Sequence, residues 1–303
     1  AIDAFRGCML KEIKTFYPGP VKQTTELMHT ATSHRSMDGV SLYVDVKEQL
    51  LKLADCRFVA TIVGSGTVAN EVMFGMVKSV FPKQQGLIVS NGEFGERLIY
   101  QAKHWELTFV QKSYDWGATF NLAEIEAMFI ENDIRWLAFV HGETSTGTCN
   151  PLHNLIQLCQ KYNVKLCVDC ISSFGTQPFS LKDVFCATAV SGKAIGALGG
   201  LSFVFYNDEP AEIEGIPSYV NLDTYHNYMP FTVPVFLLAN TLVALEQYPA
   251  RFEVLQQRLQ LMLDSSIYLQ YGLQTAHYPI IVTFVGMNDF YTCTRLNAFD
   301  LHG

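Results

Sequence analysis

The chain has 303 residues, of which 49% are hydrophobic and 17% are charged, a composition typical of a globular protein with a sizeable core. Its net charge is -8 and Lys and Arg form no run, which argues against nucleic acid or an anionic membrane surface as the main partner. Its apolar stretches are all shorter than the roughly 18 residues that a transmembrane helix needs.

The cysteine usage and the N-terminus predict a cytoplasmic location. There are eight cysteines, and in a long, apolar chain these are expected to be buried thiols in a reducing compartment. The first residues lack a signal-peptide pattern. Cys167 and Cys170 have C-x-x-C spacing, but they lie in a strand-like run and no second pair completes a zinc set. No metal site is therefore expected.

In chain order, apolar strands alternate with helices. After an N-terminal arm at residues 1–20 we expect helices at 40–53, 68–80, from the turn at 91–97 to about 103, 122–131, 152–162, within 230–248 and at 249–269. We expect strands at 58–63, 86–90, 106–110, 136–140, 164–169, 185–190, 201–206 and 280–285. This alternation predicts an α/β fold with a mostly parallel sheet covered by helices on both faces.

Four unusual turns follow predicted strands, and in open α/β sheets ligands bind at the carboxyl ends of the strands. Ser65, Gly66 and Thr67 open a helix, which suits one phosphate, although a plain strand-to-helix turn has the same pattern. Phe94 lies between glycines and either stacks on a planar ligand or caps the core. Thr144 belongs to a polar turn whose hydroxyls either bond a ligand or cap the next helix.

Asp169 and Lys193 are charged residues at the ends of two apolar strands. A buried carboxylate needs a cationic partner, which an arginine or a pyridinium nitrogen supplies; a helix cap is the other possibility. A desolvated lysine acts as an amine nucleophile toward a carbonyl, whereas a solvated loop lysine does not. Phosphate cradle, stacking ring, carboxylate and lysine together indicate pyridoxal 5'-phosphate (PLP). A dinucleotide-dependent dehydrogenase is disfavoured, because no G-x-G-x-x-G motif is present.

The motifs that carry these residues resemble those of the class V aminotransferases of PLP fold type I, over residues 17–269. The 2-aminoethylphosphonate–pyruvate transaminases resemble the chain most, and alanine–glyoxylate and serine–pyruvate aminotransferases follow. The motifs are Pro18-Gly-Pro20, Gly64-Ser-Gly-Thr67, Asn91-Gly-Glu-Phe-Gly-Glu-Arg97, His141-Gly-Glu-Thr-Ser-Thr-Gly147, Asn150-Pro-Leu152, Val168-Asp-Cys-Ile-Ser-Ser-Phe-Gly175, Ser191-Gly-Lys193 and Pro230-Phe-Thr-Val-Pro234.

The resemblance implies a role for each residue. Lys193 would form the Schiff base and move the proton, while Asp169 would pair with the pyridine nitrogen. Phe94 would stack on the ring, Thr144 would approach the ring hydroxyl, and Ser191 would lie near the phosphate that Ser65, Gly66 and Thr67 hold. The family's homodimer would bring Thr232 to the phosphate in the neighbouring subunit.

Two features depart from the family pattern. Family members carry a C-terminal Arg-Ile-Gly-like strand that binds the substrate anion, and this chain ends at Gly303 before such a strand. The Ser33-His-Arg35 segment resembles the alanine–glyoxylate side. We therefore expect a large PLP-binding domain at residues 1–250 and a small, shortened C-terminal domain at 251–303.

The resemblance implies transfer of an amino group from a small amine, such as 2-aminoethylphosphonate, to pyruvate or another 2-oxo acid. The alternatives are an alanine–glyoxylate or serine–pyruvate aminotransferase, a PLP-dependent lyase, and a PLP-binding protein without catalysis.

Overall fold

The computed structural model describes residues 33–210 and 215–265. Their helices are α1 (Met37–Ala54), α2 (Gly66–Val80), α3 (Glu93–His104), α4 (Leu122–Asn132), α5 (Leu152–Tyr162), the short η2 (Ser218–Val220), α6 (Asp223–His226) and α7 (Val235–Leu263). The strands are β1 (Phe58–Val63), β2 (Gly86–Ser90), β3 (Phe109–Ser113), β4 (Trp136–Val140), β5 (Gly142–Glu143), β6 (Thr148–Cys149), β7 (Lys165–Asp169), β8 (Cys186–Val190) and β9 (Leu201–Tyr206).

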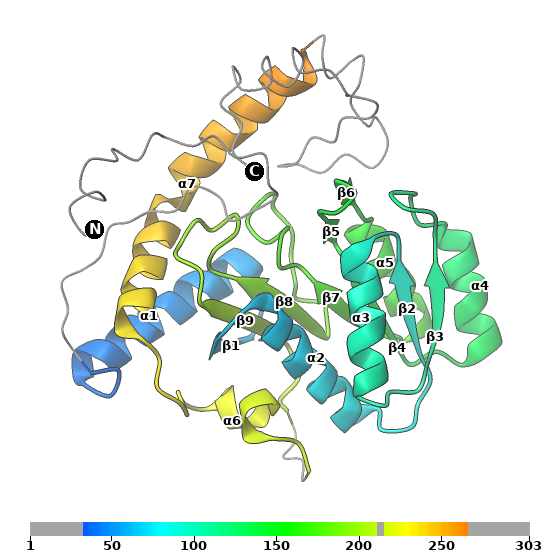
Figure 1. Ribbon diagram of the computed structural model, residues 1–303, viewed down its shortest axis with the longest axis horizontal. Coiled ribbons are helices and arrows are strands. Elements are labelled where there is room, and N and C mark those ends of the chain that lie inside the picture. Colours follow the sequence, from blue (N-terminus) through cyan, green and yellow to red (C-terminus); the bar gives the residue numbers. More distant parts are fainter. Residues whose placement is uncertain (1–32, 211–214, 266–303) are drawn as a thin grey trace, which may run out of the picture.

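Seven of these strands form one sheet in the order β1-β9-β8-β7-β4-β2-β3, and β5 pairs with β6 in a separate ribbon (Figure 1). Strands β8, β7, β4, β2 and β3 are mutually parallel, and β9 runs antiparallel to both of its neighbours. Because β1 and β8 are both antiparallel to β9, they point the same way. The carboxyl ends of β1, β2, β4, β7 and β8 therefore meet at one edge of the sheet, as the sequence predicts.

Helices cover both faces of the sheet, and each face has its own apolar core. Alternate residues of one strand, such as Leu137 and Ala138 of β4, belong to different cores. One core includes side chains of α1, α4, α5 and α7, and the other includes side chains of α2, α3 and α6. Figure 1 shows α2 and α3 lying in front of the sheet. No helix in the described ranges combines the length and the apolar character needed to cross a membrane.

The strand expected at 106–110 and the two helices expected on either side of Pro249 differ from the structure. Strand β3 begins at Phe109 and not at residue 106, because Glu106 takes a left-handed conformation with φ of 52° and Leu107 N–H still bonds to the carbonyl of Ala102. The left-handed residue and this hydrogen bond terminate α3 before the chain becomes extended.

The two helices expected on either side of Pro249 are one continuous helix, α7. Proline removes one intrahelical hydrogen bond, but side chains next to Pro249 anchor the helix to the body of the protein. Tyr248 hydroxyl donates to the carbonyl of Gly175 and Arg251 Nη1 donates to the carbonyl of Ile195. The arm at residues 1–20 and the strand expected at 280–285 lie outside the described residues, and the division at residue 250 stays a prediction.

Candidate functional site

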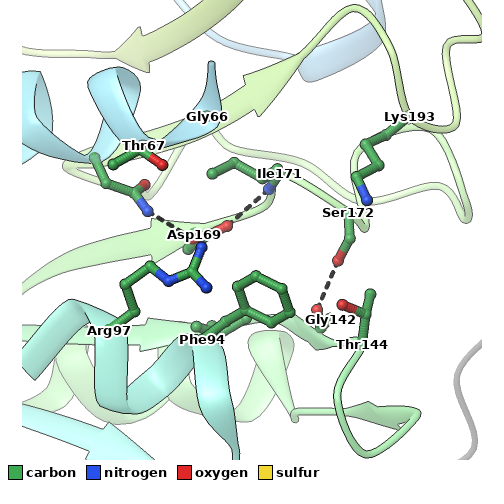
Figure 2. Close-up of a pocket in the computed structure, with 12 residues that line it drawn as sticks. Gly66, Thr67, Phe94, Arg97, Gly142, Thr144, Asp169, Ile171, Ser172 and Lys193 are labelled. Atoms are coloured by element: carbon green, nitrogen blue, oxygen red, sulfur yellow. Dashed lines mark hydrogen bonds between the residues drawn. The ribbon is translucent and has the colours of Figure 1, made fainter. Parts of the chain in front are cut away.

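A cavity of about 150 Å³ opens at the carboxyl edge of the sheet, where the predicted turns converge (Figure 2). Its lining comes from α2, α3, the ends of β4 and β7, the β5 ribbon and the turn after β8. The lining residues are Gly66, Thr67, Asn70, Phe94, Arg97, Val140, Gly142, Thr144, Asp169, Ile171, Ser172 and Lys193. Six of the predicted site residues are among them: Gly66, Thr67, Phe94, Thr144, Asp169 and Lys193.

The first turn of α2 faces the cavity with backbone N–H groups that the helix itself does not use. Ser65 is the N-cap in an extended conformation, and its side chain makes no capping bond. A Cβ atom on Gly66 would lie 2.5 Å from Cδ1 of Ile171, so a larger residue there would displace the Ile171 side chain that lines the cavity. This arrangement favours an anion at the helix N-terminus.

Asp169 is buried at the end of β7, and two donors bond to its carboxylate. Asn70 Nδ2 donates to Oδ2 at 2.8 Å, and the backbone N–H of Ile171 donates to Oδ1 at 2.9 Å; dashed lines mark both bonds in Figure 2. Burial raises the pKa of Asp169 to about 6, and these two hydrogen bonds oppose that rise. A carboxylate held in this way is suited to a cationic group that enters the cavity.

Phe94 forms an apolar wall of the cavity from the first turn of α3. The guanidinium carbon of Arg97, one turn further along the helix, lies 4.8 Å from the centre of its ring. Figure 2 shows the guanidinium directed toward Asp169, and its charge contributes to lowering the pKa of that carboxyl. Figure 2 also shows Ile171 and Phe94 on opposite sides of the space in front of Asp169, which fits a flat ring between them.

Lys193 comes from the turn after β8, on the other side of the cavity. The N–H of Gly196 donates to the Lys193 carbonyl at 2.8 Å, which closes this turn. Burial lowers the pKa of the Lys193 ammonium, and the negative charge of Asp169 opposes that shift. Figure 2 shows the amine directed toward Ser172. A lysine with a lowered pKa has a larger neutral fraction at pH 7–8 and is the better nucleophile.

Thr144 and Ser172 add hydroxyl groups to the cavity wall near Lys193 (Figure 2). Both side chains are buried, and Ser172 Oγ donates to the carbonyl of Gly142 at 2.6 Å. This bond ties the turn after β7 to the β5 ribbon, so the two hydroxyls keep their place relative to the strand ends.

Three predicted site residues do not line the cavity. Ser191 is buried, and its hydroxyl donates to the carbonyl of Leu198 at 2.6 Å. Ser65 caps α2 with its side chain exposed, and Thr232 is exposed on the segment before α7. An anion at this helix N-terminus would therefore lie closer to backbone N–H groups than to the Ser65 hydroxyl. The contact predicted for Thr232 involves a second subunit.

Sequence reasoning did not select Asn70, Arg97, Ile171 and Ser172 as site residues. Asn70 follows Gly66 by four positions and Arg97 follows Phe94 by three, so helical periodicity alone places each on the same face as a selected residue. Ile171 and Ser172 directly follow Asp169. The sequence therefore indicates these four residues only through their spacing from residues that were selected.

Comparison with known proteins identifies the family of the chain. A family model described as aminotransferase class-V matches residues 8–213. The chain belongs to the class V aminotransferase family. A 2-aminoethylphosphonate–pyruvate transaminase of Pseudomonas entomophila is 30% identical, with 94% of this chain and 86% of that protein covered. The predictions of family and enzyme class are confirmed.

Two solved structures show the same fold. An alanine–glyoxylate aminotransferase from Nostoc sp. has a TM-score of 0.80 and 20% identity, covering 100% of this chain and 89% of its own. A pyridoxamine–pyruvate aminotransferase from Mesorhizobium loti has a TM-score of 0.81 and 18% identity, covering 91% and 78%. These likenesses confirm the predicted PLP fold type I.

Proposed function

We propose that this class V aminotransferase uses the cavity to bind PLP and transfers an amino group from a 2-aminoethylphosphonate-like amine to pyruvate or another 2-oxo acid. The observation that carries the proposal is that Lys193, whose pKa burial lowers, lines the same cavity as the buried Asp169 and the N-terminus of α2. The name of the Pseudomonas entomophila relative supports the choice of donor and acceptor.

The residues of the cavity match the chemical groups of PLP. The first turn of α2 suits the phosphate, and the Asp169 carboxylate suits a protonated ring nitrogen. Phe94 and Ile171 provide apolar walls for the ring. When bound, PLP supplies a carbonyl for exchange with amines and a ring that withdraws electrons from the substrate carbon.

The residues of the chain then have distinct tasks. The Lys193 amine takes a proton from the carbon that bears the donor's nitrogen and delivers it within the site. Asp169, held by Asn70 and the Ile171 N–H, keeps a positive charge on the ring nitrogen. Over both half-reactions the donor amine becomes a carbonyl and the 2-oxo acid becomes an amino acid, so the amino group and protons balance.

The alternatives differ in what they require of the site. A lyase of the desulfurase type needs a reactive thiol, yet burial raises the pKa of Cys149 to about 11 and that of Cys170 well above the ordinary value. Alanine–glyoxylate or serine–pyruvate transfer requires only another donor and acceptor. A PLP-binding protein without catalysis would bind the cofactor and not exchange its amino group.

The test is an absorbance spectrum of the protein with PLP, before and after 2-aminoethylphosphonate, alanine or serine. We expect a band in the region of roughly 390–420 nm that one donor bleaches and pyruvate restores. Lys193→Ala should lose that band, whereas Lys182→Ala, which alters an exposed lysine, should keep it. Bleaching by alanine alone would favour the alanine–glyoxylate alternative, and an unchanged spectrum in Lys193→Ala would refute the proposal.

A homodimer with a shared active site and a cytoplasmic location complete the proposal. Exposed Thr232 and half-exposed Phe236 near the start of α7 are compatible with a subunit contact. The six cysteines within the described ranges are free thiols, which suits a reducing compartment.

A further inference from the structure

A chain of buried polar side chains leads from the sheet to Asp169. Thr188 on β8 donates its hydroxyl to Asn70 Oδ1 at 2.8 Å, and Asn70 Nδ2 on α2 donates to Asp169 Oδ2 at 2.8 Å. All three residues are buried. Thr188 and Asp169 are also register partners on the parallel strands β8 and β7. The chain thus links the strand that leads to Lys193, the helix whose first turn lines the cavity, and the carboxylate.

The direction of these hydrogen bonds is fixed by chemistry. An ionised carboxylate only accepts, so Asn70 must present its NH₂ group to Asp169 and its oxygen to Thr188. In the flipped amide the Asn70 oxygen would face the carboxylate oxygen of Asp169, and the Thr188 hydroxyl satisfies the amide oxygen in the orientation that remains. Asp169 thus sets the orientation of the Asn70 amide, and Thr188 supplies the donor that this orientation requires.

The charge environment of Asp169 explains why the orientation matters. The charged groups around its carboxyl are Glu143 of β5, Arg97 of α3 and Lys193 of the turn after β8, and Cys170 follows it in the chain. Burial favours the neutral acid, which can no longer pair with a cationic ring nitrogen. Among the effects that lower the pKa of Asp169 and so oppose burial, the hydrogen bond from Asn70 is the largest.

We propose, on the basis of the PLP-dependent function above, that Asn70 and Thr188 are positioning residues that keep Asp169 ionised and aimed at the ring nitrogen of PLP. Neither residue needs to react. Thr188 holds the Asn70 amide in place, and the amide holds the carboxylate. The remaining lone pairs of Asp169 are then available to the cofactor on the cavity side.

The test compares two ligands: PLP, and the analogue in which a C–H group replaces the ring nitrogen. Dissociation constants are measured from pH 6 to pH 9 for the wild type, Asn70→Leu, Thr188→Val and Thr188→Ser. For PLP at pH 7 we expect roughly tenfold weaker binding in Asn70→Leu and roughly threefold in Thr188→Val. Thr188→Ser keeps the hydroxyl and should bind like the wild type.

The analogue separates positioning from mere structural damage. It has no ring nitrogen, so its affinity should be the same in all variants, and it shares the aldehyde, so titration of Lys193 affects both ligands alike. The loss for PLP should shrink toward pH 9, because Asp169 then ionises even without Asn70. Thr241→Val is the matched control, since Thr241 is buried and its hydroxyl donates to the Leu237 carbonyl of α7.

Each contrary result has its own meaning. If the wild type binds no PLP, the proposed function itself fails. If the wild type binds PLP and the variants bind it equally well, Asn70 and Thr188 do not position Asp169. Equal losses for both ligands, unrelieved at high pH, would show that the chain of bonds only maintains the fold and would overturn the inference. Thr188→Val distinguishes these outcomes even if Asn70→Leu does not fold.

Discussion

At the scale of single residues, the site depends on groups that are unfavourable for stability. Asp169 is buried with its charge, and Lys193 is half-buried. Burial is the main cause of both pKa shifts: it raises the pKa of Asp169 and lowers the pKa of Lys193, so each shift favours the uncharged form. Such displacements are expected where a cofactor later supplies the missing opposite charge. Without the cofactor, they make the stability of the protein depend on pH.

Asp169→Asn should therefore change how stability varies with pH in the PLP-free protein. The folded-state pKa of Asp169 is about 6, above its ordinary value of 3.8, so the native state holds a proton that the unfolded state has lost between these values. The free energy of unfolding of the wild type falls as pH rises through this window. Relative to the wild type, the variant should gain about 2 kcal/mol between pH 4 and pH 8.

Urea unfolding curves of the two proteins at steps of one pH unit measure this difference. Asp115→Asn changes an exposed aspartate and serves as the control, for which little change with pH is expected. If the difference between wild type and Asp169→Asn were constant from pH 4 to pH 8, Asp169 would not have a raised pKa.

At the scale of elements, the N-terminus of α3 is held by a carboxylate from another part of the chain. Glu143 of β5 is fully buried, and its Oε2 accepts the N–H groups of Phe94 and Gly95, each at 3.0 Å. Its Oε1 accepts the N–H and the hydroxyl of Ser145. A Cβ atom on Gly92 would lie 2.5 Å from the Glu143 side chain, which explains the glycine two residues before Phe94.

Glu143→Gln should destabilise the protein and loosen the Phe94 wall. Glutamine offers one oxygen where four donors converge, so its NH₂ group must face at least one of them. We expect a loss of about 2–4 kcal/mol in the free energy of unfolding together with weaker PLP binding. Denaturant unfolding and PLP titration measure the two effects. Glu131→Gln, at an exposed position near the end of α4, should change neither, and a Glu143→Gln protein as stable as wild type would contradict the assigned bonds.

Elements whose residues carry a local pattern were predictable from the sequence, and those set by tertiary bonds were not. Strands β1, β2 and β4 match their expected limits because each is an apolar run between turns. The late start of β3 depends on a left-handed Glu106, and the continuity of α7 depends on anchors outside the helix. The site follows the same division. Asp169 ends β7 and Lys193 lies in the turn after β8, and both were selected, whereas Asn70 is significant only because α2 turns it toward Asp169.

At the scale of the whole molecule, α7 connects regions that are far apart in sequence. It packs along α1 and contributes Leu237 and Leu238 to the core. Further along the helix, Tyr248 bonds to the carbonyl of Gly175 in the turn after Asp169, and Arg251 bonds to that of Ile195 in the turn after Lys193. One helix thus holds both the turn that follows Asp169 and the turn that carries Lys193.

Arg251→Met should consequently impair the reaction of Lys193 although Arg251 does not line the cavity. Arg251 Nη1 donates to the Ile195 carbonyl at 2.6 Å, and Gly196, with φ of +77°, lies so close that a Cβ atom there would overlap the guanidinium. Methionine keeps an unbranched apolar stem and loses this bond, so the Lys193 turn should move more freely. We expect a loss of about 1–3 kcal/mol in the free energy of unfolding and slower attachment of PLP. Stopped-flow absorbance measures the rate of attachment.

Arg258→Met alters an exposed arginine of the same helix and should react at the wild-type rate. If both variants attached PLP equally fast, α7 would support the core and not the Lys193 turn.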